Sequence, residues 1–181
     1  MTTLRRSLRT AVALLLASSS ITSAGADPRA AAPEADAATT VLVVRHAERQ
    51  GDADALSSLG EARAETLAHT LAAAGVDAVY HSAAERTRAT ARPLAERLGL
   101  TPVEHPPLAV APLAARLRAE HPGEVVLVVG HSNTVPAIVH ALGGPQMPDL
   151  AHDAYDDLFL VTIGAGGETT VLHLQFGAET P

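Results

Sequence analysis

The chain has 181 residues, of which 47% are hydrophobic and only 2% are aromatic, so it can bury a sizeable core and is neither disordered nor a base-stacking platform. Its 13 basic residues are all arginine, and 20 acidic residues bring the formal net charge to −7, which argues against a nucleic-acid partner. Cysteine is absent, which excludes disulfides, thiolate nucleophiles and cysteine-based zinc sites.

The first 26 residues have the pattern of a secretory signal peptide. A positive stretch is followed by an apolar stretch and by small residues ending in an A-x-A cleavage signal: Arg5, Arg6, Arg9, Ala11–Ala17 and Ala24–Ala26. The apolar stretch is far shorter than the roughly 20 residues that span a bilayer. We therefore predict export by the Sec or the twin-arginine route to the periplasm or the medium, followed by a flexible linker (residues 27–40) and one folded domain (residues 41–177).

The predicted domain alternates strand-like and helix-like segments. Uninterrupted β-branched runs are typical of strands buried on both faces of a parallel sheet, and apolar residues at helical spacing are typical of helices packed on such a sheet. In chain order, these patterns predict a strand at Val41–Val44, a helix at Ala62–Ala74, a strand at Val76–Tyr80, a helix at Ala84–Leu98, a strand at Leu100–Val103, a helix from Pro112 to Glu120, a strand at Val125–Val129, a helix at Thr134–Leu142, and strands at Leu158–Ile163 and Thr169–Leu174.

Local signals refine this order. Ser58 and Glu61 form a capping-box pattern ahead of the first helix, and Pro93 should kink or interrupt the second. The last two strands flank the glycine-rich segment Gly164–Glu168, which predicts a terminal antiparallel hairpin. The fold class is therefore α/β: a three-layer α/β/α sandwich with a mainly parallel sheet and a C-terminal antiparallel hairpin.

Charged and polar residues follow the two most apolar strands. Arg45 and His46 come directly after the first strand, and His131 comes after Val125–Val129. Ligands bind at the carboxyl ends of strands in open α/β sheets, where helix N-termini also favour anions, so neighbouring strands would bring the two histidines together. Arg86 follows another strand, and guanidinium groups match phosphoryl oxygens in a bidentate manner. The sequence thus predicts a phosphate site at this edge.

Four segments, in order, carry a resemblance to a known family: Val43–Glu48 (an R-H-G/A pattern), Leu56–Ala64, Val79–Ala91 and Val128–Ser132. Together they resemble the histidine phosphatase superfamily, whose fold is phosphoglycerate mutase-like. The resemblance implies that His46 is a nucleophile forming a phosphohistidine, that Arg45 and Arg86 bind the phosphoryl oxygens and that His131 completes the pocket. It implies a small phosphorylated substrate or a phosphoprotein, and no cofactor or metal, because arginine supplies the positive charge.

The chain also departs from the mutase pattern. The connection between Leu100 and Pro112 is short, and Val110 stands where an L-x-E pattern would supply a proton-donating glutamate. The chain therefore resembles the short, cap-less phosphatases, including those that act on phosphohistidine, and a missing acid favours leaving groups that need little protonation. The candidate replacement acids are Glu48, Glu104, Asp156 and Asp157.

Three further residues are weaker site candidates. Glu48 and Arg49 lie just beyond the proposed nucleophile, and Asn133 is either a ligand contact or a helix N-cap. The remaining histidines show no H-x-H or H-E-x-x-H spacing, so no metal site is predicted. The leading hypothesis is a metal-independent phosphatase that hydrolyses a phosphomonoester or phosphohistidine, and the alternative is a non-catalytic module that binds phosphate or phosphosugar on the same fold.

Overall fold

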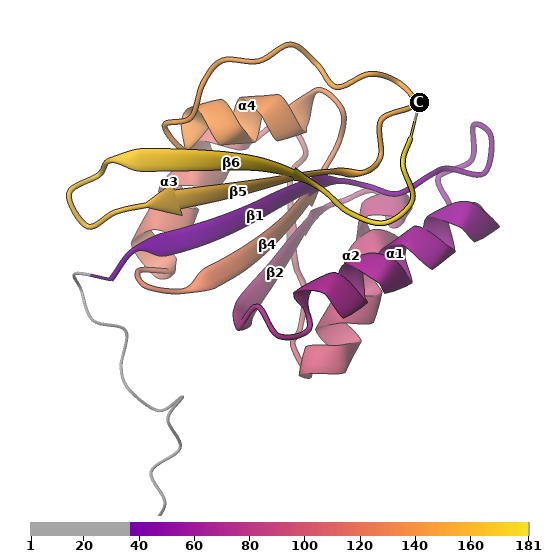
Figure 1. Ribbon diagram of the computed structural model, residues 1–181, viewed down its shortest axis with the longest axis horizontal. Helices are drawn as coiled ribbons and strands as arrows, with labels where there is room; N and C mark the ends of the chain where they lie inside the picture. The colour runs from indigo at the N-terminus through magenta and orange to yellow at the C-terminus, as the bar shows by residue number, and fades with distance from the viewer. Residues whose placement is uncertain (1–36, 181) are drawn as a thin grey trace, which may run out of the picture. The chain divides into compact units, whose positions relative to one another are not determined.

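The computed structural model describes residues 37–180 (Figure 1). The strands are β1 (Thr39–Arg45), β2 (Val76–Ser82), β3 (Val103–His105), β4 (Val125–Gly130), β5 (Asp157–Ile163) and β6 (Thr169–Gln175). The helices are α1 (Ser58–Leu71), α2 (Glu85–Leu98), α3 (Val110–Glu120) and α4 (Thr134–Ala141). The predicted signal peptide and most of the predicted linker lie outside the described residues.

The strands form one six-stranded sheet in the order β3-β2-β4-β1-β5-β6. The pairs β2–β3, β2–β4 and β1–β4 are parallel, whereas β5 pairs antiparallel with both β1 and β6. The predicted fold class, including the C-terminal hairpin, is confirmed. Because β1 and β4 are parallel neighbours, their carboxyl ends meet, and Arg45 lies opposite Gly130.

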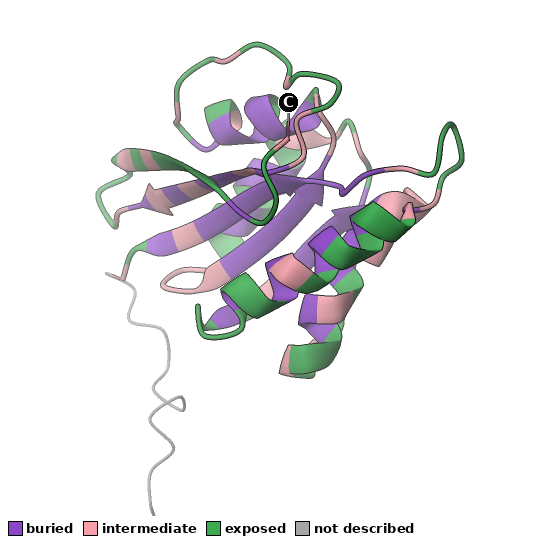
Figure 2. Cartoon of the chain, turned by 45° about the vertical axis from the view of Figure 1, so that its right-hand side comes forward, coloured by how far each residue is buried: buried purple, intermediate pink, exposed green. Residues whose placement is uncertain are grey.

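Alternate residues of β1 enter two different cores. Val41 and Val43 pack in a cluster with residues of α3 and α4, whereas Leu42 and Val44 pack in a cluster with residues of α1 and α2. Successive strand side chains point to opposite faces, so a strand that is apolar throughout must be covered on both. Figure 2 shows this burial: β1 and β4 are largely purple, and α1 and α2 turn their purple faces toward the sheet. The three-layer arrangement follows directly.

The predicted starts of the first strand and the first helix are wrong, by two and by four residues respectively, since the helix begins at Ser58 and not at Ala62. β1 begins at Thr39 rather than at 41, because Thr39 and Thr40 continue the pairing with β5 and the Thr39 hydroxyl donates to the His121 carbonyl at 2.8 Å. The first helix is capped by Ser57 and not by Ser58: the Ser57 hydroxyl accepts from the Gly60 N–H at 3.1 Å. That helix also ends at Leu71, before the predicted Ala74.

Two other differences concern α2 and the strand after it. α2 runs through Pro93 to Leu98, so the predicted interruption is wrong. The third strand is Val103–His105 and not Leu100–Val103, since the Leu100 N–H still donates to the Ala95 carbonyl at the end of α2. Across the part of the chain that the structure describes, no helix combines the length and apolar character needed to cross a bilayer.

Candidate active site

The carboxyl ends of β1 and β4 bring the two predicted histidines together. The His46 N–H donates to the Gly130 carbonyl at 2.9 Å, and the His46 and His131 ring centroids lie 5.4 Å apart. Both rings line a cavity of about 410 Å³, together with Arg45, Arg49, Ala84, Arg86, Pro107, Leu108, Ser132, Asn133, Thr134 and His152. A larger cavity of about 660 Å³, between the first parts of α1 and α2, contains none of these residues.

The His46 ring is oriented by a backbone acceptor. Its Nδ1 lies 2.8 Å from the Ala47 carbonyl oxygen, and because a carbonyl only accepts, Nδ1 must carry the proton. Nε2 of the neutral ring is then left with its lone pair. Burial lowers the pKa of His46 to about 3, and the Arg45 and Arg86 charges act in the same direction. The ring is therefore neutral at pH 7, and its unprotonated Nε2 has the chemistry of a nucleophile.

His131 is held in the opposite tautomer. Nη2 of Arg86 donates to its Nδ1 at 3.2 Å, so Nε2 carries the proton and donates to the Ser82 hydroxyl at 2.7 Å. Ser82 in turn lies 3.0 Å from the Thr87 hydroxyl, which also contacts backbone carbonyls. Burial, followed by the Arg86 charge, lowers the pKa of His131 to about 4. This ring is thus a neutral hydrogen-bond donor fixed between β2 and α2.

A glycine lets α4 begin close to His131. The Thr134 hydroxyl accepts from the His131 N–H at 2.8 Å, and a Cβ on Gly130 would lie 2.8 Å from that same hydroxyl oxygen. Only a residue without a side chain fits this turn between β4 and α4. The predicted N-cap role of Asn133 is confirmed by position alone, because its side chain makes no capping hydrogen bond; it is exposed and lines the cavity.

Arg45 is buried at the end of β1 and is held by the loop before β5. Its Nη1 donates to the Ala151 and Ala154 carbonyls, each at 2.8 Å, and its guanidinium carbon lies 4.1 Å from the centre of the Tyr155 ring. Burial lowers the pKa of Arg45, but an arginine remains charged at neutral pH. Its Nε is buried without a partner among the described residues, so this cation is only partly satisfied by protein groups.

Arg86 reaches the cavity from the first turn of α2. Its Nη1 lies 2.8 Å from Oδ1 of Asp54, and its Nε is likewise buried without a partner within residues 37–180. The Asp54 carboxylate also accepts the Glu85 and Arg86 backbone N–H groups, at 3.0 and 3.3 Å. These hydrogen bonds lower the pKa of Asp54, so it stays ionised. Asp54 both caps α2 and orients Arg86.

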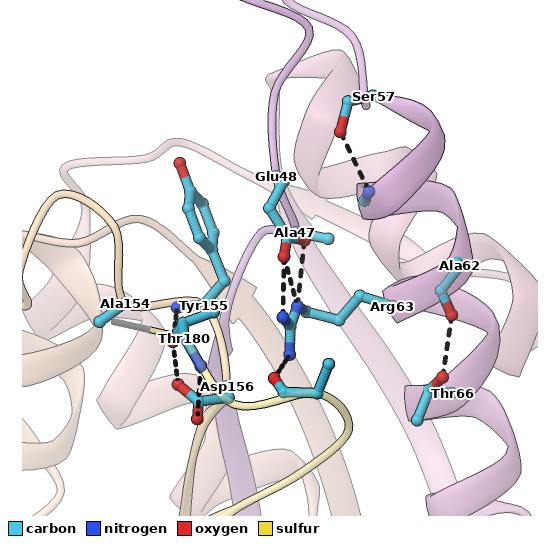
Figure 3. Close-up of polar contacts among 12 residues, drawn as sticks. Ala47, Glu48, Ser57, Ala62, Arg63, Thr66, Ala154, Tyr155, Asp156 and Thr180 are labelled. Atoms are coloured by element: carbon cyan, nitrogen blue, oxygen red, sulfur yellow. Dashed lines mark hydrogen bonds and ion pairs between the residues drawn. The ribbon is translucent and has the colours of Figure 1, made fainter.

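None of the four predicted replacement acids lines the cavity that contains His46. Glu48 is buried in an ion pair with Arg63, at 2.8 Å, and is not among the residues that line the cavity (Figure 3). Asp156 accepts from Thr180, and Asp157 pairs with His173 at 2.6 Å. Glu104 lines a separate hollow with His81. Glu48 as a cavity residue is therefore a wrong prediction: its carboxylate is taken by an arginine of α1.

Arg49 lines the cavity as predicted. Its guanidinium lies 3.9 Å from the exposed Asp52 carboxylate, and its backbone forms an isolated bridge with Leu56. A solvated pair of this kind holds an arginine only weakly. Arg49 is thus a movable cation at the edge of the cavity, unlike the buried Arg45.

Sequence reasoning missed three residues that shape the site: Asp54, Ser82 and Tyr155. Asp54 contacts Arg86, which lies 32 positions along the chain, and Tyr155 contacts Arg45 across more than a hundred. Of the three, only Ser82 could have been found from local sequence, because it ends β2 four residues before Arg86 and so lies at the same edge of the sheet. Among residues 37–180, no group of three or more His, Asp or Glu side chains is placed to hold a metal ion.

The comparisons with known proteins agree with this geometry. Residues 39–109, which include Arg45, His46 and Arg86, match the model of the histidine phosphatase superfamily (branch 1). This match covers less than half of the chain, and over that segment the chain is similar to the histidine phosphatase superfamily. No curated protein sequence matches the chain.

Several solved structures share the fold of this chain. A protein titled mycobacterial hydrolase 1 is 18% identical (TM-score 0.62), with 78% of this chain and 100% of that chain covered. The protein histidine phosphatase SixA, complexed with tungstate, is 21% identical (TM-score 0.61), with 75% and 96% covered. A phosphoglycerate mutase from Plasmodium falciparum is 18% identical (TM-score 0.55), with 80% and 99% covered. At these identities the likeness concerns the fold alone.

Proposed function

We propose that this protein is a histidine phosphatase that hydrolyses a phosphomonoester or a phosphohistidine through a covalent phosphohistidine on His46, without a metal ion. The observation that carries the proposal is one cavity lined by His46, His131, Arg45 and Arg86, in which a carbonyl holds the Nδ1 proton of His46 and leaves the lone pair on Nε2. The tungstate bound to SixA, a protein with the same fold, supports a tetrahedral oxyanion as the ligand.

In the first step, Nε2 of His46 attacks phosphorus while the bond from phosphorus to the leaving group breaks. The proton stays on Nδ1 and remains hydrogen-bonded to the Ala47 carbonyl, which stabilises the positive charge that develops on the ring. The guanidinium groups of Arg45 and Arg86 are the positive donors for the phosphoryl oxygens, and the neutral His131 ring, whose Nε2–H bonds to Ser82, lines the pocket beside them. Such preorganised donors stabilise the charge of the transition state without a cost in reorganisation.

In the second step, water attacks phosphorus and the bond from phosphorus to Nε2 breaks. Inorganic phosphate leaves, the water proton passes to phosphate or solvent, and His46 returns to its neutral form with the lone pair on Nε2. Because the pKa of His46 is about 3, the free ring does not have to lose a proton before the next cycle at pH 7. Covalent catalysis thus divides one difficult transfer into two easier ones.

The substrate class follows from the acids that the cavity lacks. Of the described cavity-lining residues, none is Asp or Glu, and the carboxylate that contacts the cavity residue Arg86, that of Asp54, is held ionised by Arg86 and the N-terminus of α2. A leaving group therefore receives little help with protonation. We infer a preference for leaving groups that need little, such as the imidazole of phosphohistidine, a phosphoanhydride or an aryl oxide, over simple alkyl oxides.

An aryl phosphate assay tests the proposal. The wild-type protein should release the aryl alcohol in the presence of a chelator, and vanadate should inhibit it. His46→Ala should lose activity by about a thousandfold or more, since no nucleophile remains. His69→Ala, an exposed histidine of α1, is the matched control and should retain full activity. A labelled, acid-labile phosphoryl group should be trapped on wild type and not on His46→Ala.

If the wild-type protein binds inorganic phosphate but releases no aryl alcohol, the result would instead support the non-catalytic phosphate-binding module.

The export pattern in the first 26 residues supports a second proposal, that the protein acts in the periplasm or the medium on phosphorylated substrates found there. Cell fractionation of the natural host tests it: the protein should be recovered outside the cytoplasm and should lack residues 1–26. Recovery of full-length protein from the cytoplasm would contradict export.

A further inference from the structure

A buried ion pair lies behind the cavity, between α1 and the residue two positions after His46. Nε of Arg63 lies 2.9 and 3.0 Å from the two carboxylate oxygens of Glu48, and Nη2 lies 2.8 Å from Oε1. Figure 3 shows this pair of side chains. Both residues are at most 9% exposed, and neither lines the cavity. Because desolvation offsets most of the attraction in such a pair, its contribution to stability alone is a weak reason for it to be there.

Two sets of contacts, called arms below, run from this pair toward the site. The first arm runs through Glu48 to the carbonyl that holds the His46 ring. The carbonyl that accepts from Nδ1 of His46 belongs to the planar peptide unit between Ala47 and Glu48. The chain on either side of that unit is held: the Ala47 N–H donates to the Thr90 hydroxyl, and the Glu48 carbonyl accepts from the Ser57 N–H. The side chain of Glu48 is the remaining group that can fix the orientation of this peptide unit, and Arg63 binds its carboxylate. Arg63 therefore helps to fix, through Glu48, the position of the Ala47 carbonyl that selects the tautomer of His46.

The second arm leads to Arg45. Nη1 of Arg63 donates to the Phe176 and Ala178 carbonyls at 3.2 and 3.0 Å, which fixes the segment 176–180 against α1. In this segment the Thr180 hydroxyl donates to Asp156 and accepts from the Tyr155 N–H.

The residues that Thr180 holds are those that carry Arg45. Figure 3 shows Thr180 next to Tyr155 and Asp156. The Tyr155 ring packs on the Arg45 guanidinium, and the neighbouring Ala154 carbonyl accepts from it. The segment 176–180 therefore supports the loop that places a phosphate-binding cation.

We propose that Arg63 is a positioning residue that joins these two arms, holding the His46 tautomer through Glu48 and the position of Arg45 through the segment 176–180; this rests on the proposed phosphatase function. Arg63 touches neither substrate nor reacting atoms. The two arms predict different kinetic effects, because the first governs the nucleophile and the second governs phosphate binding.

Steady-state kinetics with an aryl phosphate separates the arms. Glu48→Gln keeps the size of the side chain but weakens its hold on Arg63, and it should lower kcat by about tenfold or more with little change in KM. Thr180→Val removes the hydroxyl of the second arm and should raise KM severalfold with little change in kcat. Arg63→Met should do both, and Arg63→Lys should recover part of the loss. The matched controls, Arg97→Met at a surface pair with Glu65 and Thr101→Val at an exposed position, should change neither.

Two measurements test the positioning role independently of turnover. The ¹⁵N chemical shifts of the His46 ring should report the Nδ1–H tautomer in wild type and a mixture of tautomers in Glu48→Gln and Arg63→Met. Titration with inorganic phosphate should give a weaker affinity for Thr180→Val and Arg63→Met than for the controls. Variants that are folded but retain wild-type ring shifts and phosphate affinity, and differ only in melting temperature, would overturn the proposal. A protein with the expected shifts and affinities but no turnover would instead refute the proposed reaction.

Discussion

At His46 and His131, burial turns two titratable rings into neutral groups. Burial lowers their pKa values to about 3 and about 4, whereas histidines in an unfolded chain titrate near 6.5. Between about pH 6.5 and pH 4 the unfolded chain therefore binds more protons than the folded one. The free energy of unfolding then falls as the pH is lowered, by about 1.4 kcal/mol per pH unit for each such histidine.

This pH dependence is the first prediction. Urea denaturation at pH 7 and pH 5 should show a clear loss of stability in wild type and a smaller loss in His46→Gln, which has no ring to protonate in the unfolded state. His69→Gln, at an exposed position, should keep the wild-type difference. Identical losses for wild type and His46→Gln would show that His46 titrates normally in the folded protein.

The second prediction concerns Asp54, whose ionised carboxylate lies 2.8 Å from Nη1 of Arg86. This negative charge opposes the binding of a phosphate by the same guanidinium. Asp54→Asn keeps an oxygen that accepts from Arg86 but removes the charge, so the dissociation constant for inorganic phosphate should fall severalfold at low salt and less at high salt.

Isothermal titration calorimetry with inorganic phosphate measures this effect. Glu168→Gln makes the same change in net charge at the exposed turn of the terminal hairpin and should leave the affinity unchanged. Weaker binding by Asp54→Asn would mean that the orientation of Arg86 by Asp54 outweighs the competition between the two anions.

At the scale of elements, α1 packs unusually closely on the segment after β1. A Cβ placed on Gly60 would lie 2.2 Å from the Glu48 carbonyl oxygen and 3.0 Å from the Glu48 nitrogen. Both atoms are backbone, so they cannot move aside as a flexible side chain would. The Gly60 N–H also bonds to the Ser57 hydroxyl that caps the helix. Glycine is therefore needed here for the close approach of two backbones.

Gly60→Ala is the third prediction. In an ordinary helix this substitution stabilises by about 1 kcal/mol, but here the clash should reverse the sign and lower the free energy of unfolding by roughly 1–3 kcal/mol. Activity should fall as well, because the clash displaces the segment that carries His46. Urea denaturation and the aryl phosphate assay measure both effects. Ser58→Ala, two residues earlier and exposed, should stay within about 0.5 kcal/mol of wild type; equal values for the two variants would refute the close contact.

At the scale of the whole described domain, two cores share one sheet. Leu67 lies in the cluster with α1 and α2, and Leu117 lies in the cluster with α3 and α4; both are fully buried. The strands β1 and β4 contribute to both clusters, so the loss of either layer exposes the same strands. The two layers should therefore unfold together.

The fourth prediction tests this coupling. Leu67→Ala and Leu117→Ala should each lower the free energy of unfolding by about 2–5 kcal/mol through the cavity they leave. Each should still unfold in one cooperative transition. Circular dichroism should show a single midpoint, and amide exchange should give the same free energy of opening for the core amides of both layers. Leu172→Ala, 53% exposed on β6, should have a small effect. Separate transitions for the two layers would contradict a single cooperative unit.

The order of elements and the identity of the central site residues could be predicted from the sequence, because their causes are local. Uninterrupted apolar runs such as Val125–Val129 mark strands buried on both faces, and their ends mark where His46 and His131 lie. Boundaries were less accurate where a distant partner decides them: Thr39 joins β1 through its pairing with β5, and the third strand is displaced toward His105 by its pairing with Ser82.

Sequence by itself thus determined the α/β layering and the gathering of Arg45, His46, Arg86 and His131, since hydrophobic periodicity and strand direction follow from residues close together in the chain. Tertiary structure alone decided which proton each ring carries and where Glu48 points. Those outcomes depend on partners brought from far away, namely Ser82 for His131 and Arg63 for Glu48, and no local pattern encodes which distant donor will reach a given acceptor.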